Sequence, residues 1–277
     1  MQYIDIRRKI YPNPEGESYN KKIVRSGDIV EVFEYEIPVR TGNFKEHKEN
    51  LLGRAGKASE ANQMLNRYTV QKRAKKTLRR LVNANVGQYQ DARGRPYLPK
   101  FYTLTFAENI TCLDDSNYEW KKFIQRLNYH IGYKSKYVVV VEFQDRGAVH
   151  FHAIFFNLPY IPFLKVLLPL WGQGRRMRVN AIKEVDNVGA YVSKYMGKDL
   201  EDDKLVGEKC YFSSRGLLQP IETTEKSQVE SVLSALPDGF KTYETSFNND
   251  YTGEIKYRQY NLKDMAYTYV NRRTQEG

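Results

Sequence analysis

Residues 137–156 read YVVVVEFQDRGAVHFHAIFF, and this stretch decides the fold. It contains two runs of β-branched and aromatic residues, 137–143 and 149–156, which are typical of strands. The connection between them is short and contains Gly147, which favours a hairpin. The segment therefore predicts two antiparallel strands that turn around Arg146.

Three polar side chains interrupt this otherwise apolar pair of strands. His150 and His152 stand two positions apart, so a strand places both on one face. If the turn is centred on Arg146, Glu142 lies directly across from His150, with the Cβ atoms about 4.5–5.5 Å apart. Two imidazoles and a carboxylate on a rigid sheet form an open site for a divalent ion such as Mn²⁺ or Mg²⁺. An open coordination position is what chemistry on a phosphate requires.

Further elements are expected on both sides of this hairpin. β-branched and aromatic residues predict strands at residues 29–37, 101–106, 243–247 and 254–260. Helical spacing of apolar residues predicts helices at 59–86, 117–131 and 191–196. Because strands and helices are interspersed and joined by hairpins, we expect an α+β fold, a central antiparallel sheet with flanking helices.

Three segments are expected along the chain. Residues 1–95 form an N-terminal extension with a strand and a basic helix, which we interpret as DNA-binding. Residues 96–222 form the core that contains the candidate metal site. Residues 223–277 form a C-terminal β-hairpin extension packed on that core.

The charge of the chain favours a polyanionic partner. The 277 residues include 44 Lys and Arg against 33 Asp and Glu, a formal net charge of +11. Such an excess indicates nucleic acid first and an acidic membrane surface second. No run of about 18 apolar residues is present, so no transmembrane helix is expected. The first residues lack the apolar stretch of a signal peptide, and we expect a cytoplasmic protein.

Basic residues gather in the second half of the helix expected at 59–86. Its Lys72, Lys76, Arg79 and Arg80 share a face, and a loop with Arg93 and Arg95 follows. All six are candidate phosphate contacts. The alternative is a basic face that is merely solvated.

The cysteines and one histidine have simpler interpretations. Cys112 and Cys210 show no CxxC spacing, so neither a disulfide framework nor a cysteine zinc site is indicated. We expect both to be small, buried apolar residues. His130 lies beside the apolar stripe of the helix at 117–131, and we expect a core or boundary histidine rather than a ligand.

Residues 191–198, YVSKYMGK, form the second chemical motif. On a helix Tyr191 and Tyr195 lie one turn apart on the same face, and Lys194 and Lys198 repeat the same step. A phenol has a pKa near 10, but an adjacent ammonium group stabilises phenolate and a metal that polarises phosphate lowers the demand on it. Attack on a phosphodiester would give a phosphotyrosine and a free hydroxyl, and the reverse reaction would rejoin strands without ATP. The alternative is an aromatic stripe packed on the core, with the lysines in water.

Together these motifs resemble the HUH (His-hydrophobe-His) endonuclease superfamily, in particular the two-tyrosine rolling-circle replication initiators of small single-stranded-DNA phages and plasmids. The resemblance covers roughly residues 72–222. Residues 101–106 resemble the first motif of the family, Glu142 with His150 and His152 the metal motif, and residues 191–198 the nucleophile motif. Residues 211–217, YFSSRGL, also resemble the family, without a chemistry that we can assign.

The resemblance implies an RRM-like antiparallel sheet with the metal on its central strands. It also implies nicking and joining of origin DNA, single-stranded or locally melted, through a 5′-phosphotyrosine. The chain has no GxxxxGK[ST] loop for nucleotide phosphates, so no nucleotide cofactor is expected and unwinding would need a host helicase.

Other functions remain open at this point. A two-tyrosine transposase uses the same chemistry, whereas conjugative relaxases usually carry their tyrosine before the metal motif. A non-catalytic DNA-binding replication regulator and a zinc hydrolase are alternatives from other classes. Tyrosine-linked DNA would exclude both of these.

Overall fold

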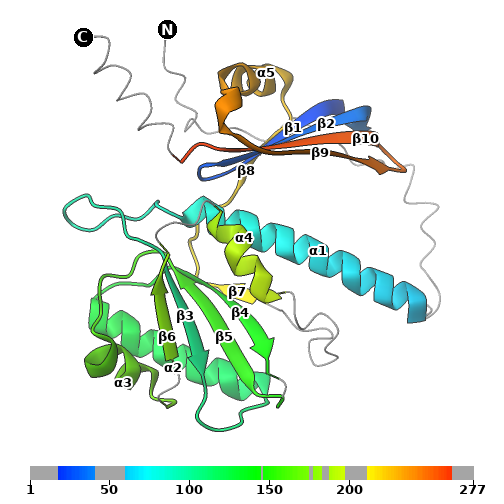
Figure 1. Ribbon diagram of the computed structural model, residues 1–277. Coiled ribbons are helices and arrows are strands. Elements are labelled where there is room, and N and C mark those ends of the chain that lie inside the picture. The colour runs from blue at the N-terminus through cyan, green and yellow to red at the C-terminus, as the bar shows by residue number, and fades with distance from the viewer. Residues whose placement is uncertain are drawn as a thin grey trace. The chain divides into compact units, whose positions relative to one another are not determined.

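The computed structural model describes residues 18–40, 60–144, 146–174, 177–182, 187–196 and 211–263. The chain divides into two compact units (Figure 1). Unit 1 comprises Met1–Met64 together with Pro220–Gly277, and unit 2 comprises Leu65–Gln219. Each contains one antiparallel five-stranded sheet with helices, which confirms the expected α+β class.

The sheet of unit 2 contains the predicted hairpin at its centre. Its strands follow the order β6 (Met177–Ala181), β3 (Lys100–Thr105), β5 (Val149–Phe155), β4 (Tyr137–Phe143) and β7 (Tyr211–Ser213). The hairpin β4–β5 turns as expected, and Glu142 is paired with His150. The candidate metal ligands therefore lie on two adjacent inner strands rather than at an edge.

One face of this sheet is covered by α2 (Leu113–Ile131) and by α3 (Leu168–Trp171), which continues the π-helical turn η2 (Phe163–Leu167) (Figure 1). The stripe of α2 that buries Trp120, Phe123 and Leu127 packs on Phe151 and Phe155 of β5. This stripe is the apolar face predicted from its spacing. The residues that point this way along β5 are the ones that alternate with the two histidines.

The opposite face, which carries the histidines, is covered by α1 (Glu60–Asn85) and α4 (Val188–Ser193). Leu78 and Val82 of α1, with Val192 of α4, belong to a buried cluster with Val140 and Ile154 of the sheet. Gly87 follows α1 with a φ of 71°, a left-handed conformation that favours glycine after a helix. Both faces of the inner strands are thus buried, which explains why β4 and β5 are apolar at almost every position.

Unit 1 is built from the two ends of the sequence. Its strands follow the order β8 (Ile221–Thr223), β1 (Ser18–Ser26), β2 (Ile29–Arg40), β10 (Gly253–Asn261) and β9 (Lys241–Asn249). The helix α5 (Lys226–Ala235) packs Val229 on Ile23, Val30 and Val32, and the short 3-10 turn η5 (Asp238–Phe240) adds Phe240 to the same cluster.

These units do not coincide with the expected three segments. The C-terminal hairpin β9–β10 completes the sheet of the N-terminal strands, because β10 pairs with β2 and Tyr260 lies opposite Val30. The basic helix α1, from Leu65 onward, belongs to the same unit as the metal motif. Strand β1 and helix α5 were not expected.

Two smaller expectations are corrected by the structure. Cys112 is exposed, because it is the residue before the first turn of α2, where the chain lies at the surface. Cys210 lies outside the described residues. His130 is also exposed rather than at the core boundary, since it sits in the last turn of α2, off the buried stripe.

No helix in the described part of the chain combines the length and apolar character needed to span a membrane.

The packing of α2 makes a stability prediction. Leu127 is fully buried, so Leu127→Ala should lower the free energy of unfolding by about 2–5 kcal/mol through lost contacts and a cavity. The chain has two tryptophans, Trp120 and Trp171, and both lie in this core, so tryptophan fluorescence during urea unfolding reports on unit 2 alone. Tyr129→Ala, on the same helix but 92% exposed, is the control and should change stability by less than about 0.5 kcal/mol. Equal effects of the two variants would contradict the packing.

Candidate metal centre and paired tyrosines

The structure brings Glu142, His150 and His152 together on one face of the sheet of unit 2. One ligand atom from each of the three side chains lies within 4.8 Å of the others, and they form a group that could hold a metal ion. His152 is buried, while Glu142 and His150 are partly exposed, so the site is rigid on one side and accessible on the other. Because all three come from paired inner strands, their backbone positions are fixed by the ladder between β4 and β5.

Two threonines of β3 support the histidines from the neighbouring strand. Thr103 lies opposite His152 and Thr105 opposite His150. The Thr103 hydroxyl is 3.4 Å from Nδ1 of His152, and the Thr105 hydroxyl contacts Nε2 of His150. Nε2 of His152, on the other side of its ring, faces Oε2 of Glu142. One ring nitrogen of His152 is thus oriented by β3 while the other points toward the carboxylate, an arrangement typical of metal-ligating histidines.

The electrostatics of the site suit a cation ligand. Burial lowers the pKa of His150 to about 4, and the neighbouring His152 lowers it further, whereas Glu142 acts in the opposite direction. His150 is therefore neutral at pH 7, the protonation state in which imidazole binds a metal. Two neutral nitrogens and one carboxylate oxygen fit a divalent ion.

Both tyrosines of the second motif reach this site. Tyr191 lies on α4 and Tyr195 on the 3-10 turn η3 (Lys194–Met196) that follows it, and their hydroxyl oxygens are 3.3 Å apart. The ring of Tyr195 stacks on His152, with 4.3 Å between ring centroids. Phe101 of β3 packs against both phenol rings, at 5.5 Å and 4.9 Å between centroids. The helix expected at 191–196 is thus present, and its two phenols lie side by side against the metal motif.

Tyr195 is not activated by its protein neighbours alone. Burial raises its pKa to about 12, and the hydrogen bond with Tyr191 and the charge of Glu142 raise it as well. At neutral pH the phenol is protonated, so nucleophilic chemistry at this residue requires a positive charge close to the oxygen. Lys194 is exposed, and Lys198 lies outside the described residues.

The basic residues are distributed differently from the expectation. Lys72, Lys76 and Arg93 are exposed, but Arg79 and Arg80 are only partly so, because α4 packs against that side of α1. Arg95 is exposed and forms a 2.7 Å ion pair with Asp91, whose carboxylate also accepts backbone hydrogen bonds within the loop. Unit 2 contains 26 Lys and Arg against 14 Asp and Glu, whereas unit 1 contains 18 against 19. The excess of positive charge therefore belongs entirely to the unit with the metal motif.

Arg178 is a candidate that the sequence motifs did not reveal. It is exposed on β6 and is paired with Thr103, so its side chain leaves the same face of the sheet as the triad. His152 lies one strand further on, opposite the same threonine. The alternation of residues 177–181, MRVNA, was the available signal for this strand.

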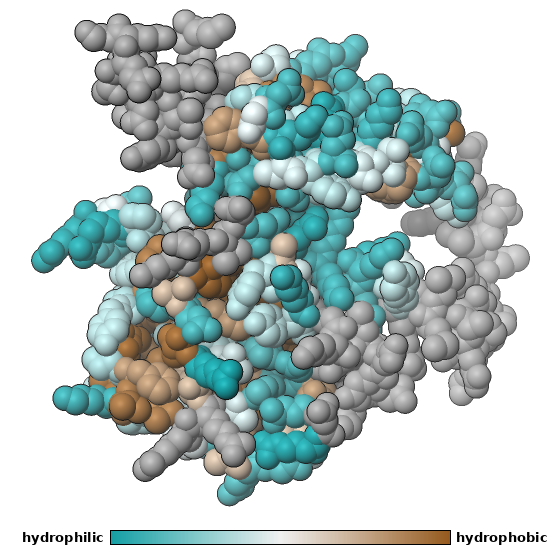
Figure 2. Space-filling model, viewed as in Figure 1, coloured by the Kyte–Doolittle hydropathy of each residue, from teal (hydrophilic) through white to brown (hydrophobic). Residues whose placement is uncertain are grey.

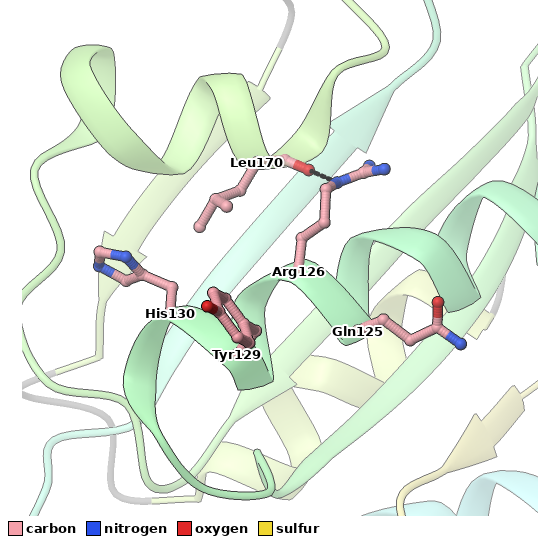
Figure 3. A pocket seen from close by; sticks show the side chains of 5 residues that line it. All are labelled: Gln125, Arg126, Tyr129, His130 and Leu170. Carbon is pink, nitrogen blue, oxygen red and sulfur yellow. Dashed lines mark hydrogen bonds between the residues drawn. The ribbon is translucent and has the colours of Figure 1, made fainter.

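A second hollow lies away from the triad, between α2 and α3. It is lined by Gln125, Arg126, Tyr129, His130 and Leu170 (Figure 3). Arg126 is occupied there by structural contacts, since its Nε donates to the Leu170 carbonyl at 2.7 Å and its Nη2 to the Trp171 carbonyl at 3.1 Å. Figure 2 shows hydrophobic surface over the position of α3, where Leu164 of η2 is 73% exposed. These features satisfy the end of a helix and do not add to the triad.

Comparison with protein families supports a role in replication. Residues 99–200 match a family of replication-associated proteins, described as the ORF2 and gene II protein type. The matched range is less than half of the chain, but it includes the strand β3, the three candidate ligands and both tyrosines. Comparisons with curated proteins and with solved structures gave no match. The chain is therefore similar to replication-associated proteins, in agreement with the resemblance to rolling-circle replication initiators.

The triad makes a prediction that does not depend on activity. Mn²⁺ should bind the protein in isothermal titration calorimetry, and His152→Ala should weaken binding by more than about 100-fold because a ligand is lost. Thr103→Val should weaken it by about 10-fold, since it removes only the group that orients His152. His130→Ala is the matched control, as His130 is exposed on α2, outside the triad. Equal affinity of the His152→Ala and His130→Ala variants would exclude the triad as the binding site.

Proposed function

We propose that the protein initiates rolling-circle replication as a metal-dependent, site- and strand-specific DNA endonuclease and strand transferase. The observation that carries this proposal is the pair of phenol oxygens, 3.3 Å apart, on a helix whose second tyrosine stacks on a candidate metal ligand. A merely structural aromatic stripe accounts for the packing on Phe101 but not for three potential ligands beside it. The match with replication-associated proteins over the same residues supports the biological role.

Each residue has a part in the proposed reaction. Glu142, His150 and His152 would hold Mn²⁺ or Mg²⁺, which when bound supplies Lewis-acid polarisation of the scissile phosphate. The hydroxyl oxygen of Tyr191 or Tyr195 attacks the phosphorus, the bond from phosphorus to the 3′-oxygen breaks, and the DNA leaves with a free 3′-hydroxyl. The phenol loses its proton as the new bond forms, and the departing 3′-oxygen gains one. The product is a 5′-phosphotyrosine, from which the reverse reaction joins strands.

Several charged groups would bind the substrate in this proposal. Lys194 and Lys198 stabilise phenolate, while Arg178 lies on the correct face of the sheet to contact a phosphate next to the scissile one. Lys72 and Lys76 of α1, with Arg79, Arg80, Arg93 and Arg95, would contact the DNA backbone further away. The substrate would be single-stranded or locally melted origin DNA in the cytoplasm of a bacterial host, opened by a host helicase.

The tyrosines provide the direct test. The protein is incubated with Mn²⁺ and a library of single-stranded oligonucleotides, and covalent adducts are mapped by mass spectrometry. Tyr191→Phe and Tyr195→Phe should each keep some cleavage, to unequal extents, since one phenol at a time lies in line with the phosphate. Strand transfer to a second oligonucleotide should need both. Tyr129→Phe, exposed on α2, is the control and should behave as the wild type.

Two outcomes would contradict this proposal in different ways. If one tyrosine never carries DNA, even when the other is Phe, the two-nucleophile mechanism is wrong and that residue has a packing role. If the wild type forms no adduct with any oligonucleotide, the endonuclease proposal fails, and a DNA-binding replication regulator becomes the better interpretation.

The basic helix gives a second test. Replacing Lys72, Lys76, Arg79 and Arg80 with Ala should weaken binding to all DNA sequences alike. It should also flatten the dependence of log K on log salt by about 0.7–0.9 per lost phosphate contact. Lys121→Ala with Lys165→Ala is the control, because both are exposed on the α2 and η2 side of the sheet. The same salt slope in both proteins would mean that α1 does not contact phosphate.

A further inference from the structure

The helix that carries the tyrosines is too short to hold its own position. Its α-helical part, α4, has six residues, and the 3-10 turn η3 adds three more. An isolated helix of this length is not stable in water, because too few hydrogen bonds offset the ordering of its first turn. The positions of Tyr191 and Tyr195 therefore depend on contacts that α4 makes with other elements.

One buried side chain of α1 forms two such contacts. Asn83 is 6% exposed, and its side-chain nitrogen donates to Oδ1 of Asn187 at 2.9 Å, while its own Oδ1 accepts the backbone N–H of Gly189 at 2.7 Å. Asn187 is the N-cap of α4, and the same Oδ1 accepts from the backbone N–H of Ala190 at 2.9 Å. Two of the N–H groups that a helix leaves unpaired in its first turn are thus satisfied, one by its own cap and one by a different helix.

Gly189 brings the two helices into backbone contact at this point. A Cβ added to Gly189 would collide with the Arg79 carbonyl oxygen and lie 2.8 Å from Oδ1 of Asn83. With no side chain between them, α4 cannot slide along α1 without breaking the Gly189 hydrogen bond. At 1.5 Å per residue, Tyr191 begins only about 3 Å along the helix from this contact.

We propose that Asn83 is a positioning residue for the tyrosine nucleophiles, an inference that rests on the proposed function. It fixes the start of α4 through Asn187 and Gly189, and thereby fixes where both phenols meet the metal motif. Asn83 does not touch the reacting atoms, so it acts on the rate of attack and not on DNA binding. A displacement of a nucleophile by about 1 Å is enough to slow a reaction by about 100-fold.

The chain offers a matched control two residues along the same helix. Asn85 is also a buried asparagine, but its side chain bonds the carbonyls of Leu81 and Leu218, the Leu218 N–H and the Tyr89 hydroxyl. None of these partners belongs to α4. Replacing either asparagine with Ala removes a buried polar network, so both variants should lose stability, but only one should lose the anchor of the tyrosine helix.

The experiment compares Asn83→Ala with Asn85→Ala in the full chain, with adduct formation measured at saturating oligonucleotide in Mn²⁺. Asn83→Ala should lower the single-turnover rate by about 100-fold, while its Kd for the oligonucleotide stays within about threefold of the wild type. Asn85→Ala should change neither by more than about threefold, whatever its loss of thermal stability. Asn83→Asp, which keeps the acceptor for Gly189 and loses the donor to Asn187, should fall between the wild type and Asn83→Ala. It also serves if the alanine variant does not fold.

Amide hydrogen exchange over residues 189–195 provides a readout that does not need activity. Asn83→Ala should increase exchange in this segment, and Asn85→Ala should not. Equal rates and equal exchange in the two alanine variants would overturn the positioning role. A wild type that forms no adduct would instead overturn the proposed function, and the exchange data would still decide whether Asn83 holds α4.

Discussion

The register between β4 and β5 is the constraint on which the candidate site depends. Glu142 faces its metal-ligand partners only because it pairs with His150, and a shift by one residue would turn its side chain to the opposite face, toward the core that α2 covers. Apolar residues on both sides of the strands oppose such a shift. Val140 belongs to the cluster under α1 and α4, while Val141 belongs to the one under α2. The same hydrophobic packing that folds unit 2 therefore sets the geometry of its polar site.

A site of this kind is polar chemistry placed on a hydrophobic surface. Phe101 packs on both phenols and on His152, and Val192 anchors α4 on the same cluster. Such surroundings hold side chains in one arrangement, but they also disfavour charge, as the neutral His150 and the protonated Tyr195 show. The protein supplies orientation at the expense of nucleophile activation, which leaves a cation as the natural complement of the site.

The features predicted from the sequence are those with short-range signals. The hairpin, the triad and the tyrosine pair each lie within a few residues, so period-two and four-residue spacing were sufficient to relate them. Strand β1 was missed because a bulge between Tyr19 and Lys21 and its basic residues obscure the alternation. The contact between Asn83 and Gly189 joins residues 106 positions apart, and neither residue type alone indicates it. The division into units was missed for the same reason, since pairing of distant strands leaves no local pattern.

The sheet of unit 1 has a consequence for synthesis on the ribosome. Strand β2 is made early, but its partner β10 follows only after the whole of unit 2. Until then β2 offers an unpaired edge, apart from β1, while unit 2 has a complete sequence and can fold. The sequence-local unit is thus expected to form first, and the closure of the outer sheet is expected to be the slow, late step of folding. Chaperones that shield strand edges would act during this interval.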